Sequence, residues 1–502
     1  MEQDLARRSF QAVIWGYIGG GGKIAAQLVI QIWLARMLGP EVFGQYAAVL
    51  VVVGFGWLFA DSGLGSALVQ KEKITDEDVG YALGWVLLLS TFSAILVAVL
   101  SPYIANALGE PKLAIPLMVC GPIIVLQAMS NLGVSLMQRD LDMKRCQIIQ
   151  LTAYVIGFGL IALGLAYIGA GVWSLVIGFL VQTLVVLIFS YAAVQHTLKP
   201  RLRGDAGLRS FGLAVLGTNL ANWAIENLDR FLIGRQWGIT ALGAYAAASN
   251  LSRVPTSLLV SSVQSVAFSS ASRIQDDHDR LRRGYISIVS LTALITFPLS
   301  VALSLKAEFV IHLLYGDRWN EAVPLFSTFC IAVPLYVLLS VTGPALWAIG
   351  AVAREFKIQL FCAAALFIGL LLLAGHPLVE AIWLIPCIYF MRFALVYLVL
   401  ARRIQLSHVT TFQALIGGLL LAVLVAATEL ASNHLISGPI AGQRWWDVIQ
   451  LLAEAVICIG AIRLFPRFMI GLELRTMLSS RSADSKFARI FCDLMALKGV
   501  QE

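Results

Sequence analysis

The sequence predicts an all-α integral membrane protein of about fourteen transmembrane helices, with two six-helix lobes around a central cavity and two further C-terminal helices. Three observations lead to this fold class. Hydrophobic residues fill 59% of the 502 positions and charged residues only 13%, against roughly 25% charged in soluble proteins. Long apolar segments follow one another along the whole chain, and one segment of the first half recurs in the second.

The apolar segments are long enough to cross a bilayer. A helix needs about 20 mainly apolar residues to span the ~30 Å hydrocarbon core. The predicted spans of the first half are Ala12–Met37, Phe43–Val69, Gly80–Leu108, Leu113–Met137, Ile148–Ile168 and Val172–Val194. Those of the second half are Phe211–Gly234, Leu242–Ala271, Tyr285–Leu314, Ala322–Ile349, Ile358–Ala374, Leu378–Leu400, Phe412–Ala431 and Trp446–Phe465.

The gaps between the spans carry an asymmetric charge. One alternate set of gaps holds 17 basic residues, namely Lys71, Lys73, Arg139, Lys144, Arg145, Lys199, Arg201, Arg203, Arg209, Arg273, Arg280, Arg282, Arg283, Arg354, Lys357, Arg402 and Arg403. The other set and its edges hold 5, namely Arg36, Lys112, Arg235, Arg318 and Arg444. Because basic loops stay in the cytoplasm, this asymmetry predicts that both termini are cytoplasmic.

An internal repeat organises the first twelve spans. The segment RMLGPEVFGQYAA at 36–48 recurs as RQWGITALGAYAA at 235–247, an offset of 199 positions, and weaker matches follow in the same order. An offset of six spans is even, so the copies share one orientation and are related by an axis along the membrane normal. The predicted divisions are an N-terminal lobe at 1–197, a C-terminal lobe at 198–403, two added helices at 404–466 and a cytoplasmic tail at 467–502.

Polar residues form matching stripes on the first and seventh spans. Lys23, Gln27 and Gln31 are spaced by four, so they share one face of a helix. The offset of 199 maps them onto a second set of polar residues, Asn222, Glu226 and Arg230. Since polar side chains inside a span usually face a cavity or a partner, both stripes are predicted to line the substrate cavity.

Other charged residues also fall inside the predicted spans. Asp61 lies at a depth that allows pairing with Lys23, and Arg253 lies level with Glu226. Arg392 has no evident partner in the sequence, and a cation facing a cavity suits a phosphate group. Asp61 and Asp229 are candidates for ion coupling or for charge pairing.

Several polar features have a structural alternative. The glycine run 19–22 predicts a loosened helix next to Lys23, or else close helix packing. Lys306 is expected near a helix end or in a local pair. Glu429 and Glu454 are expected on the added helices, away from the cavity. The tail 467–502 is either an interfacial amphipathic helix or a solvated segment.

No feature of the sequence points to catalysis. The seven cysteines and six histidines are scattered and form neither a disulfide pattern nor a metal-ligand set. We find no nucleophile motif and no phosphate loop, so neither an enzyme nor a cofactor is predicted. The net charge of +7 lies mainly in gaps between spans, where membrane topology explains it and no nucleic-acid partner is implied.

Five segments resemble the polysaccharide transporter branch of the multidrug/oligosaccharidyl-lipid/polysaccharide exporters, which includes the Wzx-type flippases. They are WLARMLGPEVFGQYA, ADSGLGSALVQ, NLDRFLIGRQWGITALGAYAAASNLSRVP, SRIQDDHDRLRRGY and LLYGDRWNEAVPLF. The resemblance implies two lobes around a basic cavity in the bacterial inner membrane. It also implies translocation of polyprenyl-pyrophosphate-linked oligosaccharides, with Lys23, Arg253 and Arg392 offered to the pyrophosphate.

Three functions are compared on this basis. The leading one is a flippase for exopolysaccharide, capsule or lipopolysaccharide O-antigen synthesis that works by alternating access. A cation-coupled multidrug exporter of the same superfamily would favour acidic and aromatic cavity residues over buried cations. A scaffold for glycan-assembly enzymes would not need a charge at Lys23. Coupling to a proton or sodium gradient, and partnership with a polysaccharide polymerase and co-polymerase, are left open.

Overall fold

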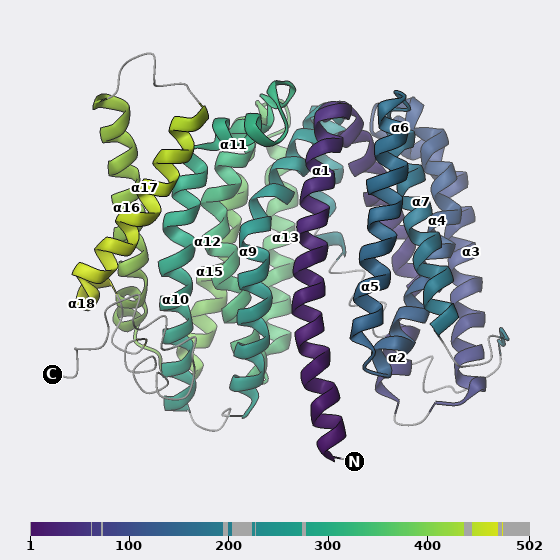
Figure 1. Ribbon diagram of the computed structural model, residues 1–502, viewed down its shortest axis with the longest axis horizontal. Coiled ribbons are helices and arrows are strands. Elements are labelled where there is room, and N and C mark those ends of the chain that lie inside the picture. The colour runs from purple at the N-terminus through teal and green to yellow at the C-terminus, as the bar shows by residue number, and fades with distance from the viewer. Residues whose placement is uncertain are drawn as a thin grey trace. The chain divides into compact units, whose positions relative to one another are not determined.

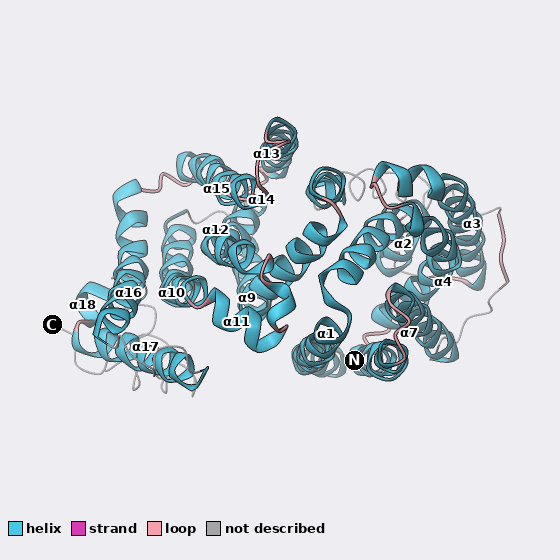
Figure 2. Ribbon diagram, turned by 90° about the horizontal axis from the view of Figure 1, so that it is seen from above, coloured by secondary structure: helices cyan, strands magenta, loops and turns pink. Residues whose placement is uncertain are grey.

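The regular structure of the described chain is helical, as the composition predicts (Figure 1). The computed structural model describes residues 2–61, 63–71, 74–193, 199–202, 223–225, 227–273, 278–435, 444–469 and 474. Within these ranges, helices and their connecting loops account for the whole backbone (Figure 2). The chain forms two compact units, Met1–Ala246 and Ala247–Glu502. The predicted lobe boundaries and central cavity stay predictions.

The first unit is a set of long helices joined by short turns. Its helices are α1 (Glu2–Asp61), α2 (Leu64–Gln70), α3 (Asp76–Ala107), α4 (Ala114–Arg139), α5 (Met143–Tyr154), α6 (Leu163–Tyr167) and α7 (Val172–Ala193). A π-helical stretch, Val155–Ala162, joins α5 to α6, so the three form one continuous rod. Helical residues 227–237 and the start of α9 (Ile239–Arg273) complete this unit.

The second unit continues from α9 to the added helices. It contains α10 (His278–Leu305), α11 (Ala307–Leu314), α12 (Ala322–Ala348), α13 (Val352–Leu372), α14 (Leu378–Ala381), α15 (Leu384–Arg403), α16 (His408–Leu435), α17 (Arg444–Leu464) and α18 (Pro466–Met469). The core of this unit lies where α10, α12 and α15 pack together, around buried residues such as Val289, Leu338 and Leu400. Helix α16 packs along α10 at one edge of the unit (Figure 2).

The membrane class is confirmed by the helix lengths. Ten helical stretches of the described chain are long and apolar enough to cross a membrane. One of them, Gly19–Leu58, contains most of the first two predicted spans. The predicted seventh span falls partly outside the described residues, and the predicted eighth span lies within α9, where the side chains are described only in part. The predicted fourteenth span corresponds to α17.

The glycine run at 19–22 does not break α1, which differs from the expected loosening. The interruption of α1 lies at Gly39, whose φ of 76° is left-handed. Pro40 follows directly, where a proline suits the first turn of the next helical segment. Within the run, a Cβ atom added to Gly19 would lie 2.5 Å from the Cβ of Gln147. A Cβ atom added to any of the three glycines at 20–22 would meet no other atom within 4 Å. Close packing against α5 therefore explains one of the four glycines.

The repeat is visible as a reciprocal contact. Gly238, the counterpart of Gly39, also has a positive φ, of 89°. A Cβ on Gly44 would meet the Ile239 carbonyl oxygen at 1.8 Å, and a Cβ on Gly243 would meet the Pro40 carbonyl oxygen at 1.9 Å. The offset of 199 maps Gly44 onto Gly243 and Pro40 onto Ile239. Each contact is therefore the repeat-related copy of the other, as in a symmetric pair.

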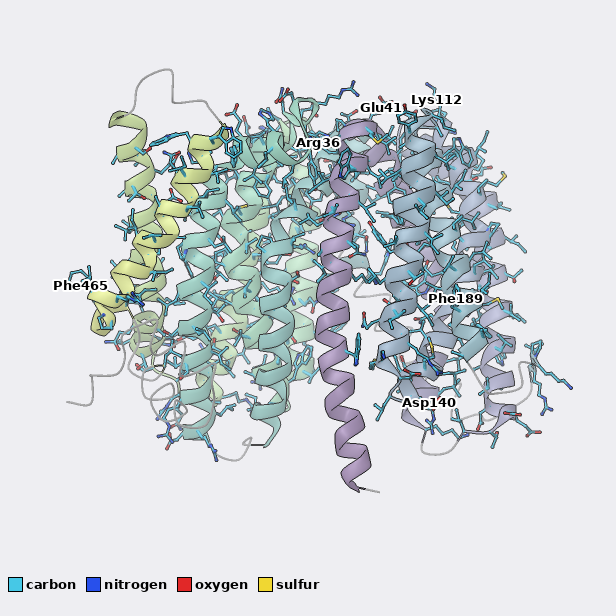
Figure 3. All side chains as sticks on the ribbon, viewed as in Figure 1. Arg36, Glu41, Lys112, Asp140, Phe189 and Phe465 are labelled. Atoms are coloured by element: carbon cyan, nitrogen blue, oxygen red, sulfur yellow. The ribbon has the colours of Figure 1, made fainter. Side chains whose placement is uncertain are left out.

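The first unit alternates its gaps between two ends, as the predicted spans require. Arg36 and Glu41, which flank the kink in α1, lie at the same end as Lys112 (Figure 3). Asp140, at the end of α4, lies at the opposite end (Figure 3). The sequence places the first three residues in gaps of one predicted side and Asp140 in a gap of the other. Which end faces the cytoplasm stays a prediction.

Candidate functional site

Lys23 contacts a neutral partner inside the first unit. Its ammonium group donates a 2.8 Å hydrogen bond to Oε1 of Gln150 on α5. The contact forms because Gly19, one turn earlier on α1, lets α5 approach closely. The side chain of Asp61, the predicted partner of Lys23, lies outside the described residues. An amide leaves the lysine's positive charge in place, so Lys23 is available to an anion.

The polar stripe on α1 has the predicted geometry. The helix is regular from its start to the kink at Gly39, so residues spaced by four lie on one face. Gln27 and Gln31 follow Lys23 on that face, and all three side chains are half-buried. The stripe therefore extends the polar surface of Lys23 by two turns.

The second copy of the stripe is described in part. Asn222 and Glu226 lie outside the described residues, while Asp229 and Arg230 are half-buried. The hydroxyl of Tyr245 donates to Oδ2 of Asp229, and the backbone N–H of Arg230 donates to Oδ1 at 2.7 Å. These bonds hold Asp229 against the repeated motif that contains Tyr245.

In the second unit, two arginines lie on either side of a pair of tyrosine rings in the order of these contacts. The guanidinium of Arg253 on α9 lies 5.4 Å from the ring centre of Tyr336 on α12, a cation–π contact. Tyr336 packs edge to face against Tyr389 on α15, with 6.1 Å between ring centres. Arg392 follows Tyr389 by three positions on the same helix. Three helices thus bring Arg253, Tyr336 and Tyr389 together, and Arg392 lies about one turn of α15 from Tyr389.

Arg392 has an acidic neighbour that the sequence did not indicate. Its Nη2 lies 3.5 Å from Oε1 of Glu355 on α13, a loose ion pair. The indole N–H of Trp347 also donates to Glu355, which is 7% exposed. The Nε–H of Arg392 is buried, and no acceptor among the described residues reaches it. Arg392 is therefore oriented by Glu355 and keeps a donor for another acceptor.

Several residues of this site were not predicted. Gln150 is one of several glutamines, and Tyr336 stands in an apolar run without a local pattern. Glu355 carried a weak signal, because it is an acid between Arg354 and Lys357 in a predicted basic gap. The predicted site residues remain predictions: the structure places Lys23 with Gln31 in one unit and Arg253 with Arg392 in the other.

Comparison with known proteins places this helical architecture in context. The family model described as "Polysaccharide biosynthesis protein" matches residues 33–324, more than half of the chain. The match begins just before the kink in α1 and ends at the start of α12, so it includes both copies of the repeated motif.

Three of the relatives found by sequence carry names from polysaccharide biosynthesis. The succinoglycan biosynthesis transport protein ExoT of Rhizobium meliloti is 28% identical over 70% of this chain and 71% of its own length. The lipopolysaccharide biosynthesis protein WzxC of Escherichia coli is 25% identical over 74% of this chain and 76% of its own length. The teichuronic acid biosynthesis protein TuaB of Bacillus subtilis is 24% identical over 76% of this chain and 80% of its own length.

Solved structures share the fold. The lipid II flippase MurJ in an inward closed conformation matches with a TM-score of 0.73 at 15% identity, over 91% of this chain and 99% of that one. An inward-facing multidrug resistance transporter of the MATE family matches with a TM-score of 0.60 at 15% identity, over 76% and 94%. At these identities the likeness concerns the fold alone.

Proposed function

Because this chain belongs to the polysaccharide biosynthesis protein family, we propose that it is a flippase for polyprenyl-pyrophosphate-linked oligosaccharides. It serves the synthesis of exopolysaccharide, capsule or lipopolysaccharide O-antigen in the bacterial inner membrane, with both termini in the cytoplasm. The sequence relatives support this role, since their names describe the transport or assembly of such polymers. The activity is transport without covalent chemistry.

The observation that carries the proposal is the set of incompletely neutralised cations inside helices. A charge at the centre of a span costs about 2.5–3.5 kcal/mol on insertion scales, so such residues persist where they serve a function. Lys23 is held by an amide, and Arg392 keeps a free Nε–H beside its loose pair with Glu355. Both suit the oxygen atoms of a pyrophosphate, which accept charge-assisted hydrogen bonds.

The aromatic residues of the second unit fit the sugar part of the substrate. Tyr336 and Tyr389 are half-buried and lie next to the arginines. Aromatic faces pack against the C–H faces of sugar rings, while their hydroxyl groups bond sugar hydroxyls. A multidrug exporter would use aromatic residues too, but for a cationic drug it would leave an acid exposed. Here the Glu355 carboxylate is buried against Trp347 and Arg392.

In the proposed cycle the sugar head group moves through the protein while the lipid tail stays in the bilayer. The repeat supports alternating access by two lobes, as in other transporters built from parallel repeats. A proton or sodium gradient would supply the energy. Polysaccharide polymerase and co-polymerase proteins would receive the translocated unit.

The test compares Lys23→Ala and Arg392→Ala with the charge-preserving variants Lys23→Arg and Arg392→Lys. We expect both alanine variants to reach the membrane at normal levels but to lose most of their export, so that lipid-linked repeat units accumulate on the cytoplasmic side. Lys23→Arg should retain most export, because a point charge suffices there. Arg392→Lys should retain less, because a lysine lacks the fork that engages Glu355 and an anion together. Normal surface polysaccharide in both alanine variants would refute the proposal.

The orientation has its own test. Single cysteines are placed at 196–210 and at 438–444 in a chain whose native cysteines are replaced. An impermeant thiol reagent added outside the cell should label only the second segment. Labelling of the first segment instead would reverse the predicted topology.

A further inference from the structure

A buried charged cluster connects the two added helices to the rest of the second unit. Lys306 lies between α10 and α11, and its ammonium group is 2.8 Å from Oε1 of Glu429 on α16 and 2.7 Å from Oδ1 of Asp447 on α17. It also donates to Oε1 of Gln450, whose Nε2 donates to Ser432 on α16. An ammonium group has three N–H donors, so these three oxygens use all of them.

Glu454 lies beside this cluster with its carboxyl group incompletely satisfied. It follows Gln450 by one turn of α17 and is 5% exposed. Glu429 on α16 is its acidic neighbour, close enough for the two carboxyl groups to interact. Oε2 of Glu454 is buried, and no donor among the described residues reaches it. Lys306 acts on Glu454 through its charge, but its hydrogen bonds go to other oxygens.

The cluster holds more acidic groups than its one ammonium group can balance. The titratable groups around Glu454 are Glu429 on α16, Lys306 before α11, and Asp447 and Cys458 on α17 itself. With every carboxyl group ionised, three negative charges would face one ammonium group. Two adjacent buried carboxylates resist joint ionisation, whereas a carboxylic acid can donate its proton to a neighbouring carboxylate. Protonation therefore removes one excess charge and gives Glu454 a partner.

We propose that Glu454 is a proton-binding site of this protein, in which the bound proton is donated to Glu429. The proton binds to a carboxylate oxygen of Glu454 and leaves from the same atom, with no other bond formed or broken. Glu429 keeps its negative charge and its pair with Lys306. The ligand is a proton, and the site is made by α16 and α17 together with Lys306.

Proton occupancy is linked to the packing of the added helices. Separating α17 from α16 would expose Glu454 to other partners and release its proton. Conversely, loss of the proton would place two carboxylates against each other and weaken the packing. This coupling is reciprocal by thermodynamic necessity. Glu429 lies six residues before the end of α16, about 9 Å along the helix, and in the predicted orientation that end faces the outside.

Infrared titration of the purified full-length protein tests the site directly, because a protonated carboxyl group absorbs separately from a carboxylate. We expect the wild type to show one buried protonated carboxyl band that disappears in Glu454→Gln. Glu308→Gln changes an exposed carboxyl group on α11, two positions after Lys306; it is the matched control and should keep the band. A wild type without the band, or a Glu454→Gln variant that retains it, would overturn the proposal.

A second variant and a second measurement guard against misfolding of Glu454→Gln. In Glu429→Gln, the amide can donate to Glu454, and Lys306 then balances Asp447, so the band should also disappear.

Thermal unfolding supplies the other readout. A proton held by the folded protein and released on unfolding makes stability fall as pH rises. The wild type should show a steeper fall than Glu454→Gln, and equal slopes would contradict the assignment.

Discussion

Two lysines of this protein have opposite environments. Lys23 on α1 donates one hydrogen bond to a neutral amide, at 2.8 Å from Gln150. Lys306, between α10 and α11, contacts two carboxylates and an amide and is 7% exposed. The difference separates a cation that is available to a ligand from one that is consumed by the fold. Burial of a positive charge alone therefore does not identify a binding residue.

The largest expected effect is on the stability that Lys306 provides. Lys306→Met leaves Glu429 and Asp447 without their cation, and removal of one partner from a buried ion pair costs about 3–5 kcal/mol. Chemical unfolding of the detergent-purified protein measures this loss. Lys23→Met, which removes a cation from an amide, is the control and should lose much less. Equal losses would break the comparison between the two lysines.

A double variant sharpens the interpretation of Lys306. Lys306→Met combined with Asp447→Asn removes the cation and one of the charges that it balances. The double variant should be more stable than the sum of the single losses implies, with an interaction energy of about 0.5–3 kcal/mol. Strict additivity would mean that Lys306 and Asp447 do not interact.

For Lys23, the expected effect falls on transport rather than on stability. A hydrogen bond to a charged group contributes about 1.5–3 kcal/mol, so loss of one substrate contact should slow export roughly tenfold to hundredfold. The measurement is the rate at which surface polysaccharide appears in cells that produce Lys23→Met at wild-type levels. Wild-type export at wild-type protein levels would mean that Lys23 does not contact the substrate.

Gln150 should matter less than the lysine that it orients. Gln150→Leu removes one neutral partner and leaves the charge of Lys23, for a cost of about 0.5–1.5 kcal/mol. Export should fall by less than in Lys23→Met, while the substrate concentration for half-maximal transport rises. A loss as large as that of Lys23→Met would instead show that Gln150 binds the substrate itself.

The smallest effect is expected at an ion pair on the surface. Arg282 and Asp279 are 2.8 Å apart near the start of α10, with side chains 40% and 74% exposed. Solvent screens such pairs, so Asp279→Asn should change the unfolding free energy by less than about 0.5 kcal/mol. A larger loss in the same unfolding assay would mean that the exposure of an ion pair does not determine how much it contributes to the unfolding free energy.

The repeat shows how far local sequence can predict structure. The matching segments at 36–48 and 235–247 predicted equivalent backbones, and Gly39 and Gly238 both adopt positive φ. That prediction succeeded because a glycine with left-handed φ, followed by the first turn of a new helix, depends on only a few neighbouring residues of the sequence. The glycine run at 19–22 misled for the opposite reason, since glycine permits a bend without requiring one.

The sequence singled out the cations of the candidate site as residues inside apolar segments, but it did not indicate their partners, and the site itself stays a prediction. Lys23, Arg253 and Arg392 are recognisable because charge in an apolar segment is conspicuous. Arg392 was expected to stand alone, yet Glu355 lies 3.5 Å away on another helix. Tyr336, which lies under Arg253, is one aromatic residue among many in an apolar chain. Contacts between helices leave no such local signal.

By itself the sequence determined that the chain spans a membrane, the order of most helices, the repeat, and which cations lie inside apolar helices. These follow from apolar length, charge and local spacing, which a linear pattern contains. Only the tertiary structure decided that Lys23 meets Gln150, 127 positions away, and that Lys306 balances acids on α16 and α17. Those pairings depend on the rotation and tilt with which each helix packs, and packing is a property of the whole unit.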